Sequence, residues 1–347
     1  MGEKDTITRF LEFIGIKGYE ARAYLTLLRM GEAPAPKIAA KAGIPLPRIY
    51  DVLENLLRRG LVEVRAGRPR IYRALPPSVS LTRYVKNYVD ELLRLNEQVI
   101  TALEKIYGKR ESREPYIWLS HSMEASIERI RDWLTGFKID GFASMRSDVL
   151  GSIVGTLTKK LMTEKHVVFS LTLLDDPGER IMKRLMKVDN LMVLRQSTGF
   201  INALELDSKQ AVIYGRGYTL FTTEPELLAL LNDTYYFGYW RNAEVLKEIA
   251  VEPPVMYRTT HHWLALRIVH NALDKGYTPW LHIIGRYTAN GKPVEMRARA
   301  IDTYRSPDDK TRTILVVDEA GEKHSVGGLG ASVEEIEARY IEIEVKD

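Results

Sequence analysis

The sequence predicts a multidomain α/β protein with a helical head, a helical coiled-coil linker, an α/β domain and a small C-terminal β-barrel. Three observations lead to this fold class. The 347 residues are too many for one ordinary hydrophobic core. Short helical patterns and a β-hairpin occupy residues 1–76, and strands alternate with helices from residue 115 onward. Between these regions, apolar residues repeat every 3.5 positions.

Charge is unevenly distributed along the chain. The whole sequence has a formal net charge of +4. Residues 1–110 contain 20 Lys and Arg against 12 Asp and Glu, a net of +8, and the rest carries 30 against 34, a net of −4. A basic head on a mildly acidic body is expected where nucleic acid contacts the head alone. The charge alone leaves an alternative open, in which the basic residues only keep the helix surfaces of the head soluble and bind no nucleic acid.

Composition excludes several classes of site. The chain has no cysteine, which excludes disulfides, thiolate catalysis and cysteine-ligated metal centres. No stretch approaches about 18 uninterrupted apolar residues, so no membrane-spanning helix is expected. Charged residues interrupt the first ten positions, which argues against a signal peptide. We therefore expect a cytoplasmic protein without a membrane partner or a cofactor.

Residues 1–76 are expected to form a winged helix-turn-helix. Four short amphipathic helices are predicted, which end at or near Gly15, Gly31, Gly43 and Gly60. Pro47 suits the first turn of the fourth helix, where its missing N–H is not needed. Two strands over residues 61–65 and 71–75, joined by a tight turn, form the wing.

In this motif the second helix of the turn-linked pair enters the major groove of double-stranded DNA with its N-terminal residues at base edges. The candidate base-contacting residues are Leu46, Arg48, Tyr50 and Asp51. The candidate wing residues, for phosphates or a minor groove, are Arg65, Arg68 and Arg70, with Arg73 as a further candidate. The alternatives are that the head binds protein instead, and that Tyr50 packs under the wing.

Two motifs in this head resemble the TrmB family of archaeal sugar-responsive regulators. They are Gly-Tyr-Glu-Ala-Arg-Ala-Tyr, from Gly18 to Tyr24, and Ile-Pro-Leu-Pro-Arg-Ile-Tyr-Asp-Val-Leu-Glu-Asn-Leu, from Ile44 to Leu56. The first is moderately specific to that family, and many winged helices share the second in outline. The resemblance implies a transcriptional regulator of sugar uptake or metabolism genes rather than an enzyme.

The predicted linker, residues 77–110, carries an apolar stripe with a period of 3.5. Its two heptad positions hold Leu81, Val85, Tyr88, Leu92, Leu95, Val99, Ala102 and Ile106. A repeat of this length predicts a coiled coil, which would join two heads into a homodimer suited to a palindromic operator. A single helix packed on its own domain is the alternative, and residues that widen the stripe, such as Val89 and Leu93, favour partial internal packing.

Residues 115–252 are expected to form an α/β layer with a hairpin around Ser208 and Lys209. A polar helix from Pro225 and a final segment over residues 237–246 follow the hairpin and close this part. This order of elements resembles one half of the phospholipase D-like fold, which TrmB-type regulators carry in degenerate form. The enzymes need a nucleophilic His and a Lys on the strand after the hairpin. At the matching place, Asp207-Ser-Lys-Gln-Ala-Val-Ile contains no histidine. Phosphodiesterase activity is therefore not expected.

Residues 253–347 are expected to contain one helix, over residues 259–275, and four or five short strands that make a small β-barrel. His261 and His262 are adjacent, so they point to different faces and do not suit one metal ion. We therefore expect no metal site here, and a core or surface role for both histidines.

The most informative segment of this region is a glycine-rich loop followed by carboxylates. Three glycines in four residues let backbone amides approach a ligand closely, although a plain turn is the alternative. Gly-Gly-x-Gly-Ala, an acidic pair and Ile-Glu-Ala resemble the C-terminal signature of TrmB-type regulators, where this region takes part in sugar binding. The resemblance assigns a maltose- or glucose-type sugar to Gly327, Gly328, Gly330, Ala331, Ser332, Glu334 and Glu335. Trp240 is a weaker candidate from the α/β part.

A second function is a chromatin-like DNA-binding protein that senses no ligand and whose body only oligomerises. The glycine-acidic loop counts against it, because a protein that only coats DNA would not need that loop. The leading interpretation is therefore a dimeric DNA-binding regulator that responds to a sugar.

Overall fold

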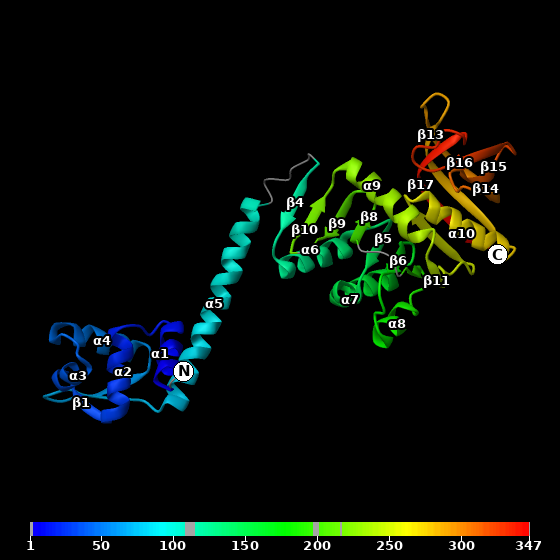
Figure 1. Ribbon diagram of the computed structural model, residues 1–347. Coiled ribbons are helices and arrows are strands. Elements are labelled where there is room, and N and C mark those ends of the chain that lie inside the picture. Colours follow the sequence, from blue (N-terminus) through cyan, green and yellow to red (C-terminus); the bar gives the residue numbers. More distant parts are fainter. Residues whose placement is uncertain (1–2, 108–114, 197–200, 216, 347) are drawn as a thin grey trace. The chain divides into compact units, whose positions relative to one another are not determined.

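The protein is described here by a computed structural model (Figure 1), which describes residues 3–107, 115–196, 201–215 and 217–346. The chain divides into two compact units, Met1–Ser112 and Arg113–Asp347. The finer boundaries at residues 76, 110 and 252 stay predictions. None of the described helices is long and apolar enough to cross a membrane.

The first unit begins with four helices and a three-stranded sheet, and the predicted helix-turn-helix with its wing is confirmed. The helices are α1 (Glu3–Phe13), α2 (Tyr19–Met30), α3 (Ala35–Ala42) and α4 (Leu46–Arg58). The sheet has the order β1 (Glu32–Pro34), β3 (Ile71–Ala74) and β2 (Val62–Arg65). Strand β1 was not predicted, because three residues are too few to show an alternating pattern.

The apolar stripe of α4 forms the centre of the head core, as its spacing predicted. Ile49, Leu53 and Leu56 are fully buried and Val52 nearly so. These positions recur every three or four residues, so they line one side of the helix and leave the opposite side for solvent or a partner. The stripe therefore fixes which residues of α4 face outward.

The linker forms one helix, α5 (Pro77–Tyr107), whose start is anchored to the head. Leu81, Tyr84 and Val85 pack against the head core. The Tyr84 hydroxyl donates to the Ile14 carbonyl at 3.1 Å, and the Arg83 guanidinium donates to the Gly60 carbonyl at 3.0 Å. The alternative, a helix packed on its own domain, is therefore correct for the first turns of α5, where Leu81 and Val85 of the predicted stripe contact the head core.

Beyond this anchor, every described side chain of α5 from residue 86 to residue 106 is exposed. The exposed apolar residues are Tyr88, Val89, Leu92, Leu93, Leu95, Val99, Ile100, Leu103 and Ile106. Residues 108–110 of the predicted linker lie outside the described residues. The stripe is thus present on a long helix, and the coiled coil itself stays a prediction.

The second unit begins with an eight-stranded sheet of order β11-β7-β6-β5-β8-β9-β10-β4. The strands are β4 (Ile117–Ser120), β5 (Asp140–Met145), β6 (Val168–Leu173), β7 (Leu191–Arg195), β8 (Asn202–Leu206), β9 (Gln210–Tyr214), β10 (Thr219–Thr222) and β11 (Glu244–Lys247). β5, β6 and β7 pair in parallel, and the other neighbours pair antiparallel. The mixed α/β architecture is confirmed, although β10 and β11 were not predicted as strands.

Both faces of this sheet are covered, because the buried strands send alternate side chains to two cores. On β6, Phe169, Leu171 and Leu173 face the core that contains α6 (Met123–Gly136), α7 (Ser147–Thr163) and α8 (Glu179–Leu185). On the other side, Ser170 and Thr172 hydrogen-bond to Tyr235 of α9 (Pro225–Tyr235). A π-helical turn, η1 (Tyr236–Trp240), continues α9.

The C-terminal part consists of one helix and six strands. The elements are β12 (Val255–Thr259), α10 (His262–Asp274), β13 (Thr278–Tyr287), β14 (Pro293–Arg305), β15 (Arg312–Asp318), β16 (Lys323–Gly327) and β17 (Ile336–Lys346). Strands β17, β13, β14, β15 and β16 pair in a ring closed by β16 with β17, and β12 is added beside β17. The predicted barrel stays a prediction. The predicted helix start was wrong, because Thr259 belongs to β12.

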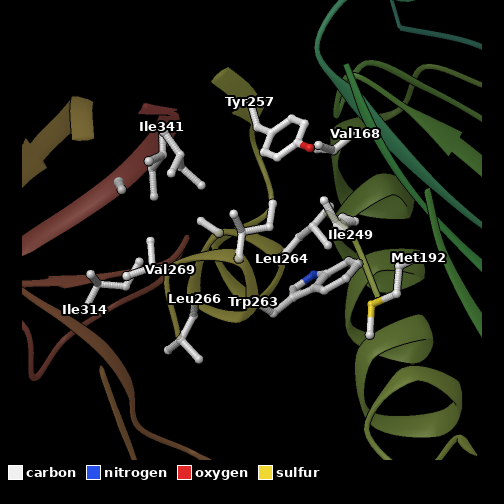
Figure 2. Close-up of a cluster of buried hydrophobic side chains, with 14 of the residues drawn as sticks. Val168, Met192, Ile249, Tyr257, Trp263, Leu264, Leu266, Val269, Ile314 and Ile341 are labelled. Atoms are coloured by element: carbon white, nitrogen blue, oxygen red, sulfur yellow. The ribbon is translucent and has the colours of Figure 1, made fainter. Parts of the chain in front are cut away.

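Helix α10 joins the two sheets of this unit through one continuous hydrophobic core. Figure 2 shows Trp263 and Leu264 on the side of Met192 and Ile249, and Val269 on the side of Ile314. Leu264 and Val269 are fully buried. The C-terminal part therefore shares its core with the α/β part and does not form a separate unit.

Candidate nucleic-acid interface and ligand loop

The four residues predicted to contact bases all lie on the outer side of α4. Leu46, Arg48, Tyr50 and Asp51 are exposed, the first and third by 48% and 51%. The exposure of Tyr50 argues against its packing under the wing. Arg48 and Asp51 also line a hollow of about 340 Å³ between α4 and the start of α2. The N-terminal turn of α4 therefore presents a cation, a carboxylate and two apolar side chains together.

The predicted wing arginines differ in how free they are. Arg65 forms an exposed ion pair with Glu32 of β1 at 3.3 Å, and Arg73 pairs with Glu63. Arg68 and Arg70, at the tip between β2 and β3, are exposed and form no ion pair among the described residues. Exposed pairs contribute only about 0–1 kcal/mol, so Arg65 is readily released to a phosphate. Arg68 and Arg70 are the stronger phosphate-binding candidates.

The glycines of the predicted ligand loop have internal packing roles. A Cβ on Gly327 would lie 2.7 Å from the carboxyl group of Glu334, and one on Gly328 would lie 2.8 Å from the His262 Cβ. Gly330 has a φ of +79°, which favours glycine. The Ala331 amide donates to the Gly328 carbonyl at 2.9 Å. The glycines therefore let the loop fold tightly against α10 and against its own carboxylate.

The two carboxylates of this loop have different surroundings. Glu334 is buried, and the Thr313 hydroxyl donates to its Oε1 at 3.0 Å. Glu335 is exposed, and its Oε2 lies 3.0 Å from the His324 Nδ1. Ser332 is also exposed. Glu335 and Ser332 are therefore directly accessible to a ligand, whereas Glu334 is reached only if its bond to Thr313 opens.

Trp240 lies in a buried aromatic cluster that the sequence did not reveal. Its ring stacks on Tyr236 at 5.3 Å between centroids and contacts Trp263 at 5.2 Å. The Arg305 guanidinium lies 5.4 Å from the Trp240 ring, and that of Arg312 lies 4.2 Å from the Tyr236 ring. Asp309 accepts a hydrogen bond from the Tyr236 hydroxyl at 2.5 Å. Arg305 and Arg312 flank the turn between β14 and β15, and arginines near a turn are too common for the sequence to have predicted this cluster.

Two buried polar atoms in the aromatic cluster have no hydrogen-bond partner among the described residues. They are the Trp240 Nε1 and the Asp309 Oδ1, and the latter lies 3.9 Å from the Arg305 Nε in an ion pair. Buried polar groups normally find a partner, so these atoms mark a place for a polar ligand or water. Arg312 contacts Tyr236, and the next residue, Thr313, contacts Glu334. The predicted Trp240 and the predicted loop are therefore linked through the start of β15.

A second polar cluster, missed by sequence reasoning, is buried where the C-terminal part meets the eight-stranded sheet. The His261 Nδ1 lies 2.6 Å from Asp140 of β5, and its Nε2 lies 2.8 Å from Glu205 of β8. All three side chains are at most 4% exposed. Asp140 also accepts hydrogen bonds from the hydroxyls of Thr259 and Thr260. Its partners lie 56 and 121 residues from His261 in sequence, so no local pattern could reveal it.

The charges of this cluster depend on one another. Burial by itself lowers the pKa of His261, but the carboxylates of Asp140 and Glu205 outweigh it and raise this pKa to about 10. Burial raises the pKa of Glu205, and the His261 charge offsets part of that rise. His262, in contrast, is neutral, since burial lowers its pKa to about 4 and its ring N–H donates to the Val326 carbonyl. Both histidines thus have core roles.

Comparison with known families agrees with this architecture. Residues 11–78 match the family described as "Sugar-specific transcriptional regulator TrmB", and residues 254–346 match "TrmB/TrmBL1, EBD C-terminal subdomain". The chain is 27% identical to the HTH-type sugar sensing transcriptional regulator TrmBL1 of Pyrococcus furiosus, over 96% of this chain and 97% of that protein. The chain is therefore similar to the TrmB family in its head and in its C-terminal part. The resemblance seen in the head motifs and the glycine loop is confirmed.

Solved structures add a likeness in fold. The structure of TrmBL2, an archaeal chromatin protein with a novel mode of DNA binding, matches 70% of this chain with a TM-score of 0.51 and 17% identity. The match covers the whole of the TrmBL2 chain. Nuc from Salmonella typhimurium, a phospholipase D family member, matches 39% of this chain with a TM-score of 0.32 and 9% identity. That score is too low to establish a shared fold, so the phospholipase D-like assignment stays a prediction.

The His261 cluster generates a stability prediction. Replacing His261 with Gln removes the only cation that contacts both buried carboxylates among the described residues. We expect the free energy of unfolding of the second unit to fall by about 3–5 kcal/mol. Because the folded pKa of His261 is about 10 and its usual value is 6.5, its contribution is complete below pH 6.5 and is lost as the pH rises toward 10. Urea denaturation across this range measures both effects.

The matched control is His270→Gln, on the exposed side of α10, where His270 pairs with Asp274. This variant should keep the stability and the pH dependence of the natural protein. Equal pH dependence in the His261 variant and the natural protein would show that the buried imidazole does not carry the charge.

Proposed function

We propose that this chain is a dimeric DNA-binding transcriptional regulator whose body binds a small sugar. The observation that carries the proposal is the head geometry: the N-terminal turn of α4 and the wing tip both present free polar and cationic side chains. A helix N-terminus of this kind reads base edges, and wing arginines contact phosphates. The match of residues 11–78 to the TrmB family supports it.

Sugar sensing is the finer part of the proposal, and it rests on the C-terminal part. The match of residues 254–346 and the similarity to a sugar sensing regulator support it. Pockets for small polar ligands combine apolar or aromatic walls with a few polar groups that fix orientation. The Tyr236 and Trp240 rings, with the Trp240 Nε1, which has no hydrogen bond among the described residues, and the exposed Glu335, offer that combination. We therefore assign a maltose- or glucose-type sugar to this region.

The alternative is a chromatin-like DNA-binding protein that binds no regulatory ligand, and the similarity in fold to TrmBL2 favours it. The observation against it is the match of residues 254–346 to a subdomain shared by TrmB and TrmBL1. A protein that only coats DNA has no need for a carboxylate-bearing loop beside an aromatic cluster with polar atoms that form no hydrogen bond among the described residues. No phosphodiesterase activity is proposed, because the hairpin region carries no histidine nucleophile.

DNA binding is tested with duplex DNA from the chain's own promoter region and fluorescence anisotropy. Arg68→Gln with Arg70→Gln should weaken binding to all sequences and lower the magnitude of the salt slope by about 1.8, since each phosphate contact contributes about 0.9. Arg48→Ala should cost about 1–3 kcal/mol and relax specificity at one base pair. Lys292→Ala, exposed in a body hairpin, is the control. Unchanged binding in both head variants would overturn the assigned interface.

The dimer is tested on the exposed stripe of α5. Leu92→Lys with Val99→Lys puts two charges at one predicted heptad position, where burial between two helices would be strongly unfavourable. We expect sedimentation to show a dimer for the natural chain and a monomer for this variant. Lys86→Glu with Lys105→Glu on the same helix alters charge outside the stripe and should leave the dimer intact. A dimer for the Leu92 and Val99 variant as well as for the control would rule out α5 as the dimer interface.

Sugar binding is tested by isothermal titration against maltose, trehalose, sucrose and glucose. We expect micromolar binding of one of them, and we expect Glu335→Ala to abolish it by removing an accessible acceptor. Glu319→Ala, in the exposed turn between β15 and β16, is the matched control. No heat with any sugar would refute the proposed ligand class and leave the DNA-binding proposal standing.

A further inference from the structure

A groove between α7 and α8, on the sheet face opposite α9, gathers an unusual amount of positive charge. It encloses about 600 Å³, and its charged lining residues are Lys159, Arg180, Lys183, Arg184 and Lys187. No carboxylate lines it among the described residues. The sequence from residue 111 onward has a net charge of −4, so this groove is a local reversal of the charge of the body. Figure 1 shows α8 beside α7 at this position.

Most of these cations have no internal partner. Lys183 pairs with Glu179 at 2.5 Å, and both side chains are exposed by more than 70%. Lys159, Arg180, Arg184 and Lys187 form no ion pair or side-chain hydrogen bond within the described residues. The four positive charges are therefore uncompensated by the protein itself, and they repel one another unless an anion lies among them.

The backbone is built to hold the two helices close together. Gly151 and Gly155 stand one turn apart on α7, facing α8. A Cβ on Gly155 would lie 3.3 Å from the Arg184 Nη1, and one on Gly151 would lie 4.0 Å from the Ile181 Cδ1. The absence of side chains at these positions lets α8 approach and places the Arg184 guanidinium across α7. The groove is thus formed by packing of defined elements as well as by its surface charges.

The adjoining surface extends the groove along α7. A hollow of about 470 Å³ shares Gly155, Lys159 and Thr163 with it. The one carboxylate in this hollow, Glu164, accepts a hydrogen bond from the buried Lys160 amine at 2.7 Å. It is therefore already neutralised, and it does not compensate the groove cations. The result is an elongated, open track along α7, with Thr158 and Thr163 among its lining residues.

Helix stabilisation explains only part of this pattern. Cations near a helix C-terminus interact favourably with the partial negative charge there, which accounts for Lys183 and Arg184 in the last turn of α8. On α7 the basic residue of the last turn is Lys160, so Lys159 is not accounted for in this way. Arg180 lies in the first turn of α8, where the same effect is unfavourable. Its presence in the groove therefore points to an external anion.

We propose that this groove, which we call the α7–α8 groove, binds the phosphate backbone of DNA as a second contact besides the head. An extended polyanion fits better than a small phosphorylated ligand, because the track is open and its cations are exposed on long flexible side chains. Sequence-independent DNA contacts are made by lysines and arginines of this kind. The proposal rests on the proposed DNA-binding function and adds a contact from the body.

The test compares three variants of the full chain in DNA binding as a function of salt concentration. The groove variant is Arg180→Gln with Arg184→Gln and Lys187→Gln, which keeps polar side chains of similar reach. The charge control is Lys209→Gln with Lys292→Gln and Lys323→Gln, which removes the same charge from exposed sites elsewhere on the body. The head variant is Arg68→Gln with Arg70→Gln. Thermal melting establishes that each variant is folded.

We expect the groove variant to lower the magnitude of the slope of log K against log salt by up to about 2.7, three contacts at about 0.9 each, and the control to leave it unchanged. The head variant should keep the groove contribution, so that combining both sets lowers the slope further. Equal slopes for the groove variant and the control would overturn the groove proposal alone. Absence of DNA binding by the natural chain would overturn the proposed function and the groove together.

A small phosphate ligand is the competing occupant. If the groove variant keeps the natural salt slope for DNA but loses the binding of inorganic pyrophosphate that the natural chain shows in titration calorimetry, the DNA contact is refuted. The groove would then belong to a small anion.

Discussion

The second unit depends on one buried ionic contact, in which His261 is held between Asp140 and Glu205. Each partner comes from a different strand of the eight-stranded sheet, whereas His261 is the N-cap residue of α10, the helix that carries the C-terminal core. A buried carboxylate is costly unless it is paired and hydrogen-bonded. Five donors meet Asp140: the Thr259 and Thr260 hydroxyls, the amides of Thr260 and His261, and the imidazole. This requirement fixes how the C-terminal part lies on the sheet.

The rest of the second unit is arranged around that fixed junction. α10 extends from His261 into a core that contains residues of both sheets, and Trp263 contacts Trp240 and Tyr236 in the aromatic cluster. The loop of Gly328 packs on the neighbouring His262. A ligand held by the loop and the aromatic cluster would therefore touch residues one or two positions from the ionic contact. A tightly packed core does not deform continuously, so a small displacement of residues at the ligand would also displace the residues packed against them.

The sequence predicted correctly the features that depend on the residue pattern of a single helix or strand. It did not predict the features that depend on contacts between elements distant along the chain. The stripe of Ile49, Val52 and Leu53 and its closing glycines define the recognition helix locally, and the outward residues follow from it. Four strands were not predicted: β1, β10, β11 and β12. They are only three to five residues long, which is too short for a clear alternating pattern. Ligand binding by the glycine loop stays a prediction, and the sequence did not reveal that Gly327 and Gly328 also make room for Glu334 and His262. The core role of His261 could not be specified from the sequence, because its partners Asp140 and Glu205 are distant along the chain.

Regulation by the proposed ligand requires two states that differ in how the heads are presented. A ligand shifts such an equilibrium only by its difference in affinity for the two states. The first turns of α5 are bonded to the head through Tyr84 and Arg83, so each head must move as one body with its helix. In the proposed dimer, a change in the angle at which two α5 helices cross would therefore also change the orientation of α4, because α5 and the head move together. Gly60 makes this joint possible, because the Arg83 guanidinium fills the space that a side chain at residue 60 would need.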